Sequence, residues 1–314
     1  MKNTSIFEKY RDNINLLINY SLIDLEYADY KDNYACPICL SKYDKIDGDV
    51  PLTLEDAPQK SLGGSTNTLT CKKCNNEAGF KIDHHLVSRL NELDNAKFLP
   101  NTEVKVKANI DGNNVNATLK IDQNGIMTIF HSTRNNNPII LGEVMPKLKK
   151  DKIIDFSFIR KNIIPDNLDY AVLKSAYIIL FQYTGYKIIL TPDYDIIRKQ
   201  ILEPQNRLIP QNFYFFSERS IMNDGVHFVC EKGLEIIVVI FTAKTTKSSR
   251  NFCVFLPLPS RPYDETLEEI FKEKLNQGEL SLSAFPESMN DFDYITDLEK
   301  LSRLDNWIKS CNLI

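Results

Sequence analysis

The amino-acid sequence predicts an α+β fold, with a small ββα finger near the N-terminus and a larger mixed α/β domain that contains antiparallel strands. Three observations lead to this prediction. Two CxxC pairs, Cys36-x2-Cys39 and Cys71-x2-Cys74, bracket a short strand-like stretch. From residue 103 apolar and polar residues alternate, which is the period of half-buried strands. Elsewhere apolar residues recur at three- and four-residue spacing, which is the period of helices packed on a core.

Composition and length limit the class of protein. The chain has 314 residues, of which 43% are hydrophobic, and its formal net charge is −4. This length suits one large domain or two smaller ones. We expect an N-terminal helix in residues 1–33, the finger in residues 34–98 and the α+β domain in residues 99–314. The N-terminus is polar and no apolar run reaches about 18 residues, so we expect a cytoplasmic protein with no membrane partner.

The first half of the chain yields one helix and a meander. A helix is expected in residues 4–30, and three strands are expected in residues 103–132. Asp111-Gly112 and Asn124-Gly125 mark the turns between the strands, because these dipeptides tolerate the positive φ angles of tight hairpins. The segment NNNPIILGEVM, residues 135–145, is expected to add a strand.

The second half combines helices with a sheet. Asp166 is the expected N-cap of a helix that Gly185 ends. The segment KIIL is expected to be extended, and Thr191 is expected to cap a helix that ends at residue 203. Four strands are expected in residues 213–257, with EIIVVIF as a buried central strand because it is apolar after its glutamate. Helices in residues 264–275 and 292–313 complete the prediction.

The two CxxC pairs predict a metal site. They are separated by 31 residues, and four thiolates at such spacing typically form a tetrahedral zinc site. Four protein ligands leave no open position, so we expect Zn²⁺ to stabilise the fold without activating water. The remaining cysteines, Cys230, Cys253 and Cys311, are expected to be buried small apolar residues.

The stretch LTLEDAPQKSLGG, followed by LTCKKCNNEAG, resembles the finger of the HNH, or ββα-metal, nuclease family. That family combines an acidic residue and a histidine at a strand end, a proline, a Gly-Gly loop and a Cys-x2-Cys-Asn that opens a helix. The resemblance covers residues 36–79 and implies a metal-dependent endonuclease with a role in bacterial defence. The later segment LKSAYIILFQYTGYKIILTPDYDIIRKQI is similar, more loosely, to bacterial HNH-type proteins of uncharacterised role.

The resemblance implies roles for four residues. Glu55 matches the acidic ligand, and Asn75 matches the helix ligand, of a catalytic Mg²⁺ or Mn²⁺ ion that would stabilise charge on a phosphate. Asn67 matches the loop asparagine that orients the base. Asp56 stands where the family has its general-base histidine. The sequence therefore departs from the family at the residue that would activate water.

Three alternatives for this departure remain open. A carboxylate is a much weaker base than imidazole at neutral pH, so Asp56 and Glu55 could both bind the metal and let it polarise water. His84 or His85 could supply the base, although nine residues of helix turn His84 away from Asn75. We expect both histidines on a solvated helix face, and His131 and His227 as structural residues. The third alternative is that the reaction is lost.

Phosphate contacts are expected from four lysines of the finger: Lys60, Lys72, Lys73 and Lys81. DNA is the expected partner and RNA the alternative, through local contacts, because an acidic chain does not bind nucleic acid over its whole surface. Two hypotheses follow from the finger. The first is a metal-dependent endonuclease, and the second is a zinc module without a reaction that binds nucleic acid or a partner protein. An oligomer is compatible with both.

Overall fold

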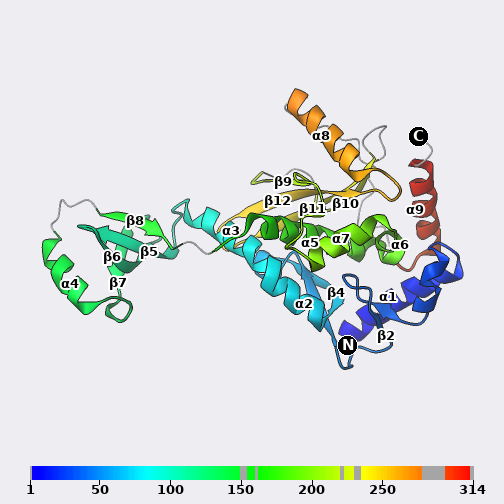
Figure 1. Ribbon diagram of the computed structural model, residues 1–314, viewed down its shortest axis with the longest axis horizontal. Coiled ribbons are helices and arrows are strands. Elements are labelled where there is room, and N and C mark those ends of the chain that lie inside the picture. Colours follow the sequence, from blue (N-terminus) through cyan, green and yellow to red (C-terminus); the bar gives the residue numbers. More distant parts are fainter. Residues whose placement is uncertain are drawn as a thin grey trace. The chain divides into compact units, whose positions relative to one another are not determined.

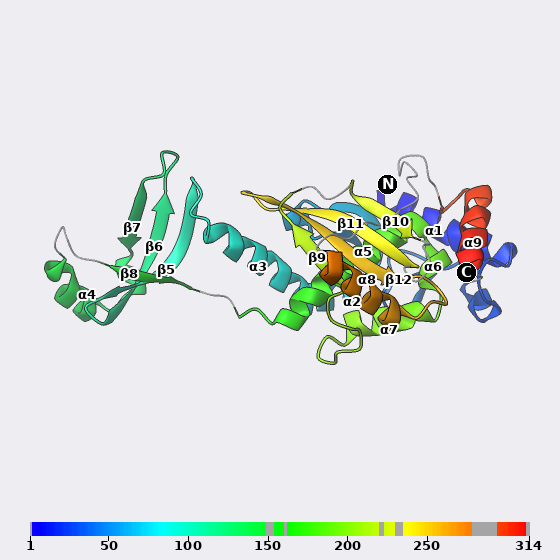
Figure 2. The same ribbon diagram turned by 90° about the horizontal axis from the view of Figure 1, so that it is seen from above.

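The structure is a computed structural model that describes residues 2–148, 154–159, 162–219, 223–229, 235–277 and 294–311. It is α+β, as predicted, with helices and antiparallel sheets (Figures 1 and 2). The chain divides into two compact units. The first contains Met1–Val87 and Ile164–Ile314, and the second contains Ser88–Ile163. This division differs from the expected boundary at residue 99, because the finger packs together with the segments that follow residue 164.

The finger is a hairpin followed directly by a helix. Strand β3 (Leu52–Ala57) pairs antiparallel with β4 (Ser65–Cys71), and helix α2 (Lys72–Ala78) begins where β4 ends. Gly63 has a φ angle of 83° in the connecting loop, which glycine adopts without steric cost. Two short strands, β1 (Tyr34–Ala35) and β2 (Lys42–Tyr43), pair antiparallel before the hairpin. The predicted ββα finger is therefore present.

A π-helical turn follows α2. It covers Gly79–Asp83 and leads into helix α3 (His84–Asn95). The wider turn changes the angular position of every later side chain relative to a regular α-helix, so α-helical spacing does not apply across it. Such turns occur frequently at functional sites.

Helix α5 (Pro165–Thr184) is the centre of the first unit. It contacts both finger strands on one side and the C-terminal sheet on another. Its residues are buried without a break from Tyr170 to Phe181. A helix enclosed in this way has no polar stripe, so a charged residue within it must find a partner inside the protein.

The C-terminal sheet has four antiparallel strands in the order β10-β11-β12-β9. The strands are β9 (Tyr214–Ser217), β10 (Gly225–Val229), β11 (Ile236–Lys244) and β12 (Ser249–Pro257). β11 has a partner on each side and is buried from Ile236 to Phe241. The predicted central strand is confirmed.

The remaining helices of the first unit cover its core. They are α1 (Lys2–Asn19), the 3₁₀ helix Leu25–Tyr30, α6 (Tyr186–Ile189), α7 (Asp193–Leu202), α8 (Tyr263–Gln277) and α9 (Leu298–Cys311). Trp307 of α9 lies against the Phe228 ring, with 5.2 Å between centroids. None of the described helices is long and apolar enough to cross a membrane.

Several predictions about elements were wrong or shifted. The helix expected to reach residue 30 ends at Asn19, and Ser21 then adopts a φ angle of 54°. The segment KIIL is helical, as α6. The N-cap of α5 is Ile164, with Pro165 in the first turn. Cys311 is buried, as predicted, and is disulfide-bonded. Cys253 is buried and free, as predicted, and Cys230 lies outside the described residues.

The second unit is a four-stranded antiparallel sheet with one helix. The strand order is β7-β6-β5-β8. The strands are β5 (Thr102–Ile110), β6 (Asn113–Ile121), β7 (Met127–His131) and β8 (Asp155–Phe158). The meander and both of its turns are confirmed, with Gly112 and Gly125 each at a φ angle of 80°.

The segment expected to add a strand to this sheet forms helix α4 (Pro138–Val144) instead. The side chain of Asn137 accepts a hydrogen bond from the backbone N–H of Ile139 at 2.9 Å, and Pro138 follows it at the first helical position. This is a strong helix start. The apolar residues of α4 then pack on Ile110 and Val115 of the sheet.

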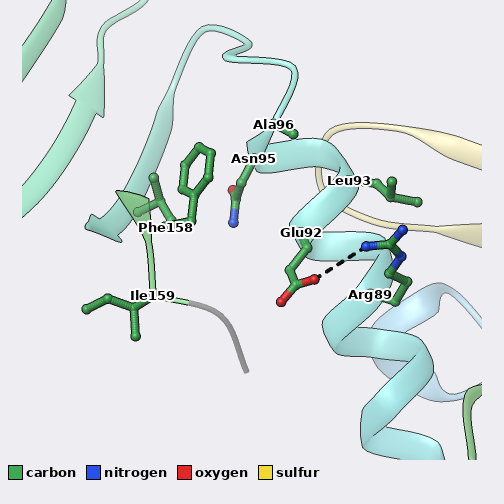
Figure 3. A pocket seen from close by; sticks show the side chains of 8 residues that line it. Arg89, Glu92, Leu93, Asn95, Ala96, Phe158 and Ile159 are labelled. Atoms are coloured by element: carbon green, nitrogen blue, oxygen red, sulfur yellow. Dashed lines mark ion pairs between the residues drawn. The ribbon is translucent and has the colours of Figure 1, made fainter. Parts of the chain in front are cut away.

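A pocket of about 410 Å³ lies between the end of α3 and the strands of the second unit (Figure 3). Val104 and Phe158 line one wall, and Arg89 and Glu92 line the other. These two charged residues form an ion pair with 3.6 Å between Nη1 and Oε2, so their charges offset one another within the pocket wall.

Candidate functional site

The four cysteines of the finger converge on one point. Cys36 and Cys39 lie between β1 and β2, Cys71 ends β4, and Cys74 lies in α2. Their sulfur atoms all lie within 4.8 Å of one another. The Cys39 and Cys71 sulfurs are 3.8 Å apart, which is far longer than a disulfide. It is the spacing of thiolates around a tetrahedral ion with metal–sulfur bonds of about 2.3 Å. The cluster is therefore suited to a structural metal ion, as predicted.

Backbone N–H groups support this cluster. The N–H of Cys71 donates to the Cys36 sulfur at 3.3 Å, and the N–H of Cys74 donates to the Cys71 sulfur at 3.4 Å. These hydrogen bonds hold the Cys36 and Cys71 sulfur atoms in place within the cluster. The cluster is also tied to α5, because the Tyr177 hydroxyl donates to the carbonyl of Pro37, between the first two cysteines. This hydrogen bond links the cysteine cluster to the central helix.

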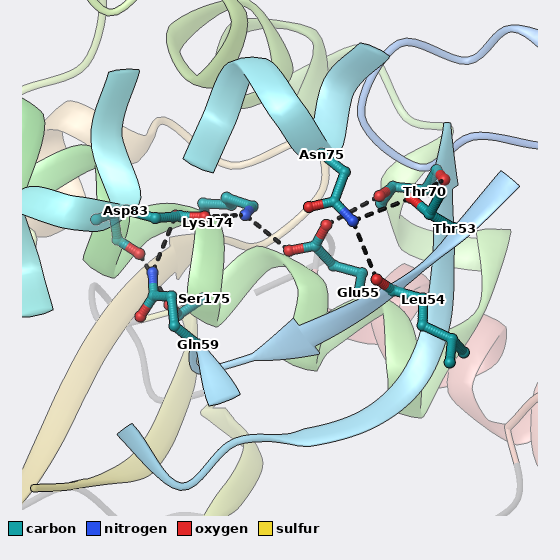
Figure 4. A network of polar contacts seen from close by, with 10 residues as sticks. Thr53, Leu54, Glu55, Gln59, Thr70, Asn75, Asp83, Lys174 and Ser175 are labelled. Carbon is teal, nitrogen blue, oxygen red and sulfur yellow. Dashed lines mark hydrogen bonds and ion pairs between the residues drawn. The ribbon is translucent and has the colours of Figure 1, made fainter. Parts of the chain in front are cut away.

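Glu55, the expected acidic ligand, lies inside the protein. Its side chain is buried, with 3% of the residue exposed. Oε1 lies 2.7 Å from the ammonium nitrogen of Lys174, and Oε2 accepts a hydrogen bond from the Thr70 hydroxyl at 2.9 Å (Figure 4). Burial raises the pKa of Glu55, while the charge of Lys174 acts in the opposite direction. Both carboxylate oxygens are therefore engaged by residues of the chain itself.

Lys174 bridges two carboxylates. It comes from α5, its side chain is 2% exposed, and its Nζ lies 2.7 Å from both Glu55 and Asp83. Burial alone would lower the pKa of Lys174, but the charges of Asp83 and Glu55 outweigh burial and raise it. The lysine therefore remains an ammonium ion at neutral pH. Gln59 donates to the other oxygen of Asp83 at 2.9 Å and completes the network.

Asn75, the expected second ligand, lies close to Glu55. Its amide nitrogen donates to the Thr53 hydroxyl and to the carbonyl of Leu54, each at 3.0 Å. In Figure 4 its amide group lies beside the Glu55 carboxylate. The hairpin and α2 thus bring together the two residues that the family pattern selects as metal ligands. The group of α5 that faces Glu55 is nonetheless the ammonium group of Lys174.

Asp56 and Asn67 lie at an irregularity of the hairpin. The register shifts between Glu55 and Asp56, so Glu55 pairs with Thr68 and Asp56 pairs with Thr66. The Thr66 hydroxyl donates to the Asp56 carboxylate. Asn67 falls between the paired residues, and its side-chain nitrogen contacts the Ser65 hydroxyl at 3.4 Å. The residue that contacts Asp56 is therefore Thr66, and not Asn67 as the resemblance implied.

The histidines and lysines of the finger differ in exposure. Lys60, Lys72 and Lys73 are exposed, while Lys81 forms an ion pair with Glu77 at 2.8 Å. His84 is exposed, as expected. The expectation for His85 was wrong: it is buried, and its Nδ1 accepts the backbone N–H of Ile164 at 3.2 Å. The π-helical turn before α3 gives His85 this inward direction.

His85 makes stability dependent on pH. Burial lowers the pKa of His85, and the neighbouring His84 lowers it further. The unfolded chain binds this proton below about pH 6.5, whereas the folded chain resists it, so stability falls as pH falls below that value. His85→Gln should reduce the loss of unfolding free energy between pH 7.5 and pH 5.5, measured by urea denaturation. The exposed His131→Gln is the control, and equal pH dependence in His85→Gln and wild type would refute the assignment.

Sequence reasoning missed Lys174, Asp83, Thr70 and Gln59. One signal was available for the first of them. Lys174 stands in the run VLKSAYIIL, and a lysine inside a helix that is otherwise apolar indicates a buried charge that requires a counter-ion. No comparable local signal marks Asp83, because the π-helical turn sets its direction.

No family model, no curated protein and no solved structure matches the chain. The resemblance to the HNH finger therefore rests on the residues of the finger alone.

Proposed function

We propose that the chain is a nucleic-acid-binding protein in which a zinc-held ββα finger serves as a scaffold and does not cleave the bound strand. Of the two hypotheses drawn from the sequence, this is the second. The observation that carries it is the position of Lys174, whose ammonium group lies against Glu55 where a catalytic metal ion would be required.

A catalytic Mg²⁺ ion needs oxygen ligands together with open positions for water and phosphate. Glu55 offers neither an open oxygen nor a solvent-facing edge, since Lys174 and Thr70 engage it and it is buried. To reach it, a metal ion would have to displace the Lys174 ammonium group from a buried ion pair, which would leave that group with Asp83 as its counter-ion. The ion pair therefore supports a structural role for Glu55 over a role as a ligand of a catalytic metal ion.

The second argument concerns the base. Position 56 carries a carboxylate, and the Thr66 hydroxyl donates to it. A carboxylate at this position does not provide the basicity of an imidazole. The finger thus lacks both an available acidic ligand and a histidine at the expected place.

The third argument concerns the ligand. Lys60, Lys72 and Lys73 are exposed on the finger. None of the three forms an ion pair within the part of the chain that the structure describes. Free lysine ammonium groups on a rigid scaffold bind phosphates through counter-ion release. These contacts support local, salt-dependent binding of DNA, with RNA as the alternative ligand.

The test combines cleavage and binding assays on the full-length protein. Fluorescently labelled duplex DNA, single-stranded DNA and RNA are incubated with the protein in Mg²⁺ or Mn²⁺ and then analysed for fragments and for anisotropy. We expect salt-sensitive binding without fragments. Fragments that appear with wild type and disappear with both Asn75→Ala and Glu55→Gln would establish the nuclease, whose support is the proximity of Asn75 to Glu55. No binding to any nucleic acid would favour a protein partner.

A single substitution distinguishes the effect of the missing histidine from the effect of the Lys174–Glu55 ion pair. Asp56→His supplies the imidazole at the position where the family has it. If the missing histidine were the only defect, this variant would cleave DNA. We expect this variant to remain inactive, because Lys174 still forms an ion pair with Glu55. Cleavage by Asp56→His would refute the role given to the ion pair.

A further inference from the structure

We propose that the second unit binds single-stranded nucleic acid on the polar face of its four-stranded sheet. The inference deepens the proposed function, since it takes nucleic acid as the ligand and places the contact outside the finger. It rests on charge, on the register of the strands and on the exposure of one aromatic side chain.

Charge is distributed unevenly between the two units. Residues 88–163 contain twelve lysines and arginines against eight aspartates and glutamates, although the whole chain has a net charge of −4. The second unit is therefore basic in a protein that is otherwise acidic. Such asymmetry indicates a partner that is a polyanion.

Strand register places three lysines on one face. Lys105 and Lys107 lie on β5, and Lys120 lies on β6. All three are exposed, and they alternate with the buried residues of the opposite face. None forms an ion pair with another described residue. Two carboxylates share the face: Glu103 lies opposite Lys120, and Asp155 lies opposite Asn109.

The lysines lie on the same face of the sheet as an exposed aromatic ring. Lys105 pairs with Thr118, and Thr118 pairs with Phe130 of β7, so these three residues form one row across the sheet. Phe130 is 46% exposed, so its ring is accessible to a ligand on this face. A base that stacks on this ring would place its backbone phosphates within reach of the neighbouring lysines.

The chemistry favours a single strand over a duplex. An exposed ring can stack only on a base that is not already stacked within a helix, and such bases are found in single strands. The asparagine amides of this face, those of Asn109, Asn114 and Asn116, form hydrogen bonds within the chain, so we expect the binding to be largely independent of sequence. The ligand class is therefore an unstructured DNA or RNA strand.

The test uses fluorescence anisotropy of the full-length protein with labelled dT15, U15 and a duplex of equal length at 0.15 M salt. The triple variant Lys105→Ala/Lys107→Ala/Lys120→Ala should bind the single strands about 50-fold more weakly, as three lost phosphate contacts imply, and its salt dependence should be shallower by about two units of log–log slope. Its control is Lys31→Ala/Lys45→Ala/Lys199→Ala, which removes three exposed lysines of the first unit and should leave affinity within about threefold.

A second pair of variants isolates the ring. Phe130→Ala should weaken binding about tenfold, and Phe130→Trp should retain it. Met127→Ala is the matched control: Met127 is also 46% exposed on β7 but pairs with Ile121 on the opposite face. Circular dichroism and thermal unfolding check that the variants remain folded.

The outcomes separate this inference from the proposed function. If wild type binds nucleic acid but the sheet variants bind as tightly as their controls, the sheet inference fails and the scaffold function stands. A preference for duplex over single strand would have the same meaning. If wild type cleaves nucleic acid through Glu55 while the sheet variants lose binding, the scaffold function fails and the sheet inference stands. Absence of any nucleic-acid binding overturns both.

Discussion

Cys39→Ser is expected to remove the bound metal and to destabilise the first unit severely. The sulfur of Cys39 is one of four that lie within 4.8 Å of one another, and structural zinc contributes about 10–16 kcal/mol in zinc-finger peptides. Cys39 is only partly buried, so the loss of packing from this substitution is small. Nearly all of its effect therefore reports on metal binding.

Metal content and stability are both measured. We expect one zinc ion per wild-type chain by inductively coupled plasma mass spectrometry, and substantially less in Cys39→Ser. A chelator should lower the melting temperature of wild type and expose residues 36–74 to proteolysis. The control is Cys253→Ala, a buried cysteine of β12 outside the cluster, which should keep its metal. A variant that lacks Cys39 and still holds a full equivalent of zinc would contradict the assignment.

Lys174→Met is expected to destabilise the protein by about 3–5 kcal/mol, because it leaves the Glu55 carboxylate buried beside Asp83 without a counter-ion. The effect should depend on pH with a definite sign. Without the ammonium group the pKa of Glu55 rises further above its unfolded value, so the folded state takes up a proton more readily. The stability of Lys174→Met should therefore increase as pH falls from 7 toward 5.

The double variant Lys174→Met/Glu55→Gln tests whether the charge is the cause. Removing the carboxylate charge as well should recover part of the lost unfolding free energy, in a double-mutant cycle measured by urea denaturation. Lys73→Met, an exposed lysine of the same finger, should change stability by no more than about 0.5 kcal/mol. If the double variant is no more stable than Lys174→Met, the ion pair does not account for the loss.

Local signals in the sequence were sufficient for much of the fold. The meander of the second unit and the central strand β11 were predicted because their side-chain period and their turn dipeptides act within a few residues. Residues 135–145 were misassigned because the apolar run suits a strand or a helix equally. The Asn137 cap and Pro138 favour the helix, and packing of its apolar residues on Ile110 and Val115 stabilises it.

The candidate site, like the fold, could be predicted from the sequence only in part. Glu55 and Asn75 were found from the finger pattern, and the hairpin with α2 brings them together. The contact between Asp56 and Thr66 depends on a register shift within the hairpin. No local sequence pattern predicted this shift. His85 was expected in solvent, and the π-helical turn directs it inward instead.

By itself, the sequence determined the four-cysteine cluster and the ββα order of the finger, because thiolate spacing and strand period are properties of neighbouring residues. Only the tertiary structure decided which groups contact the Glu55 carboxylate. Lys174 comes from a helix far along the chain, and Asp83 is turned toward it by an irregular helical turn. Burial of two carboxylates beside one ammonium group becomes favourable only when three separate segments pack together, since each charge inside a protein requires its partner.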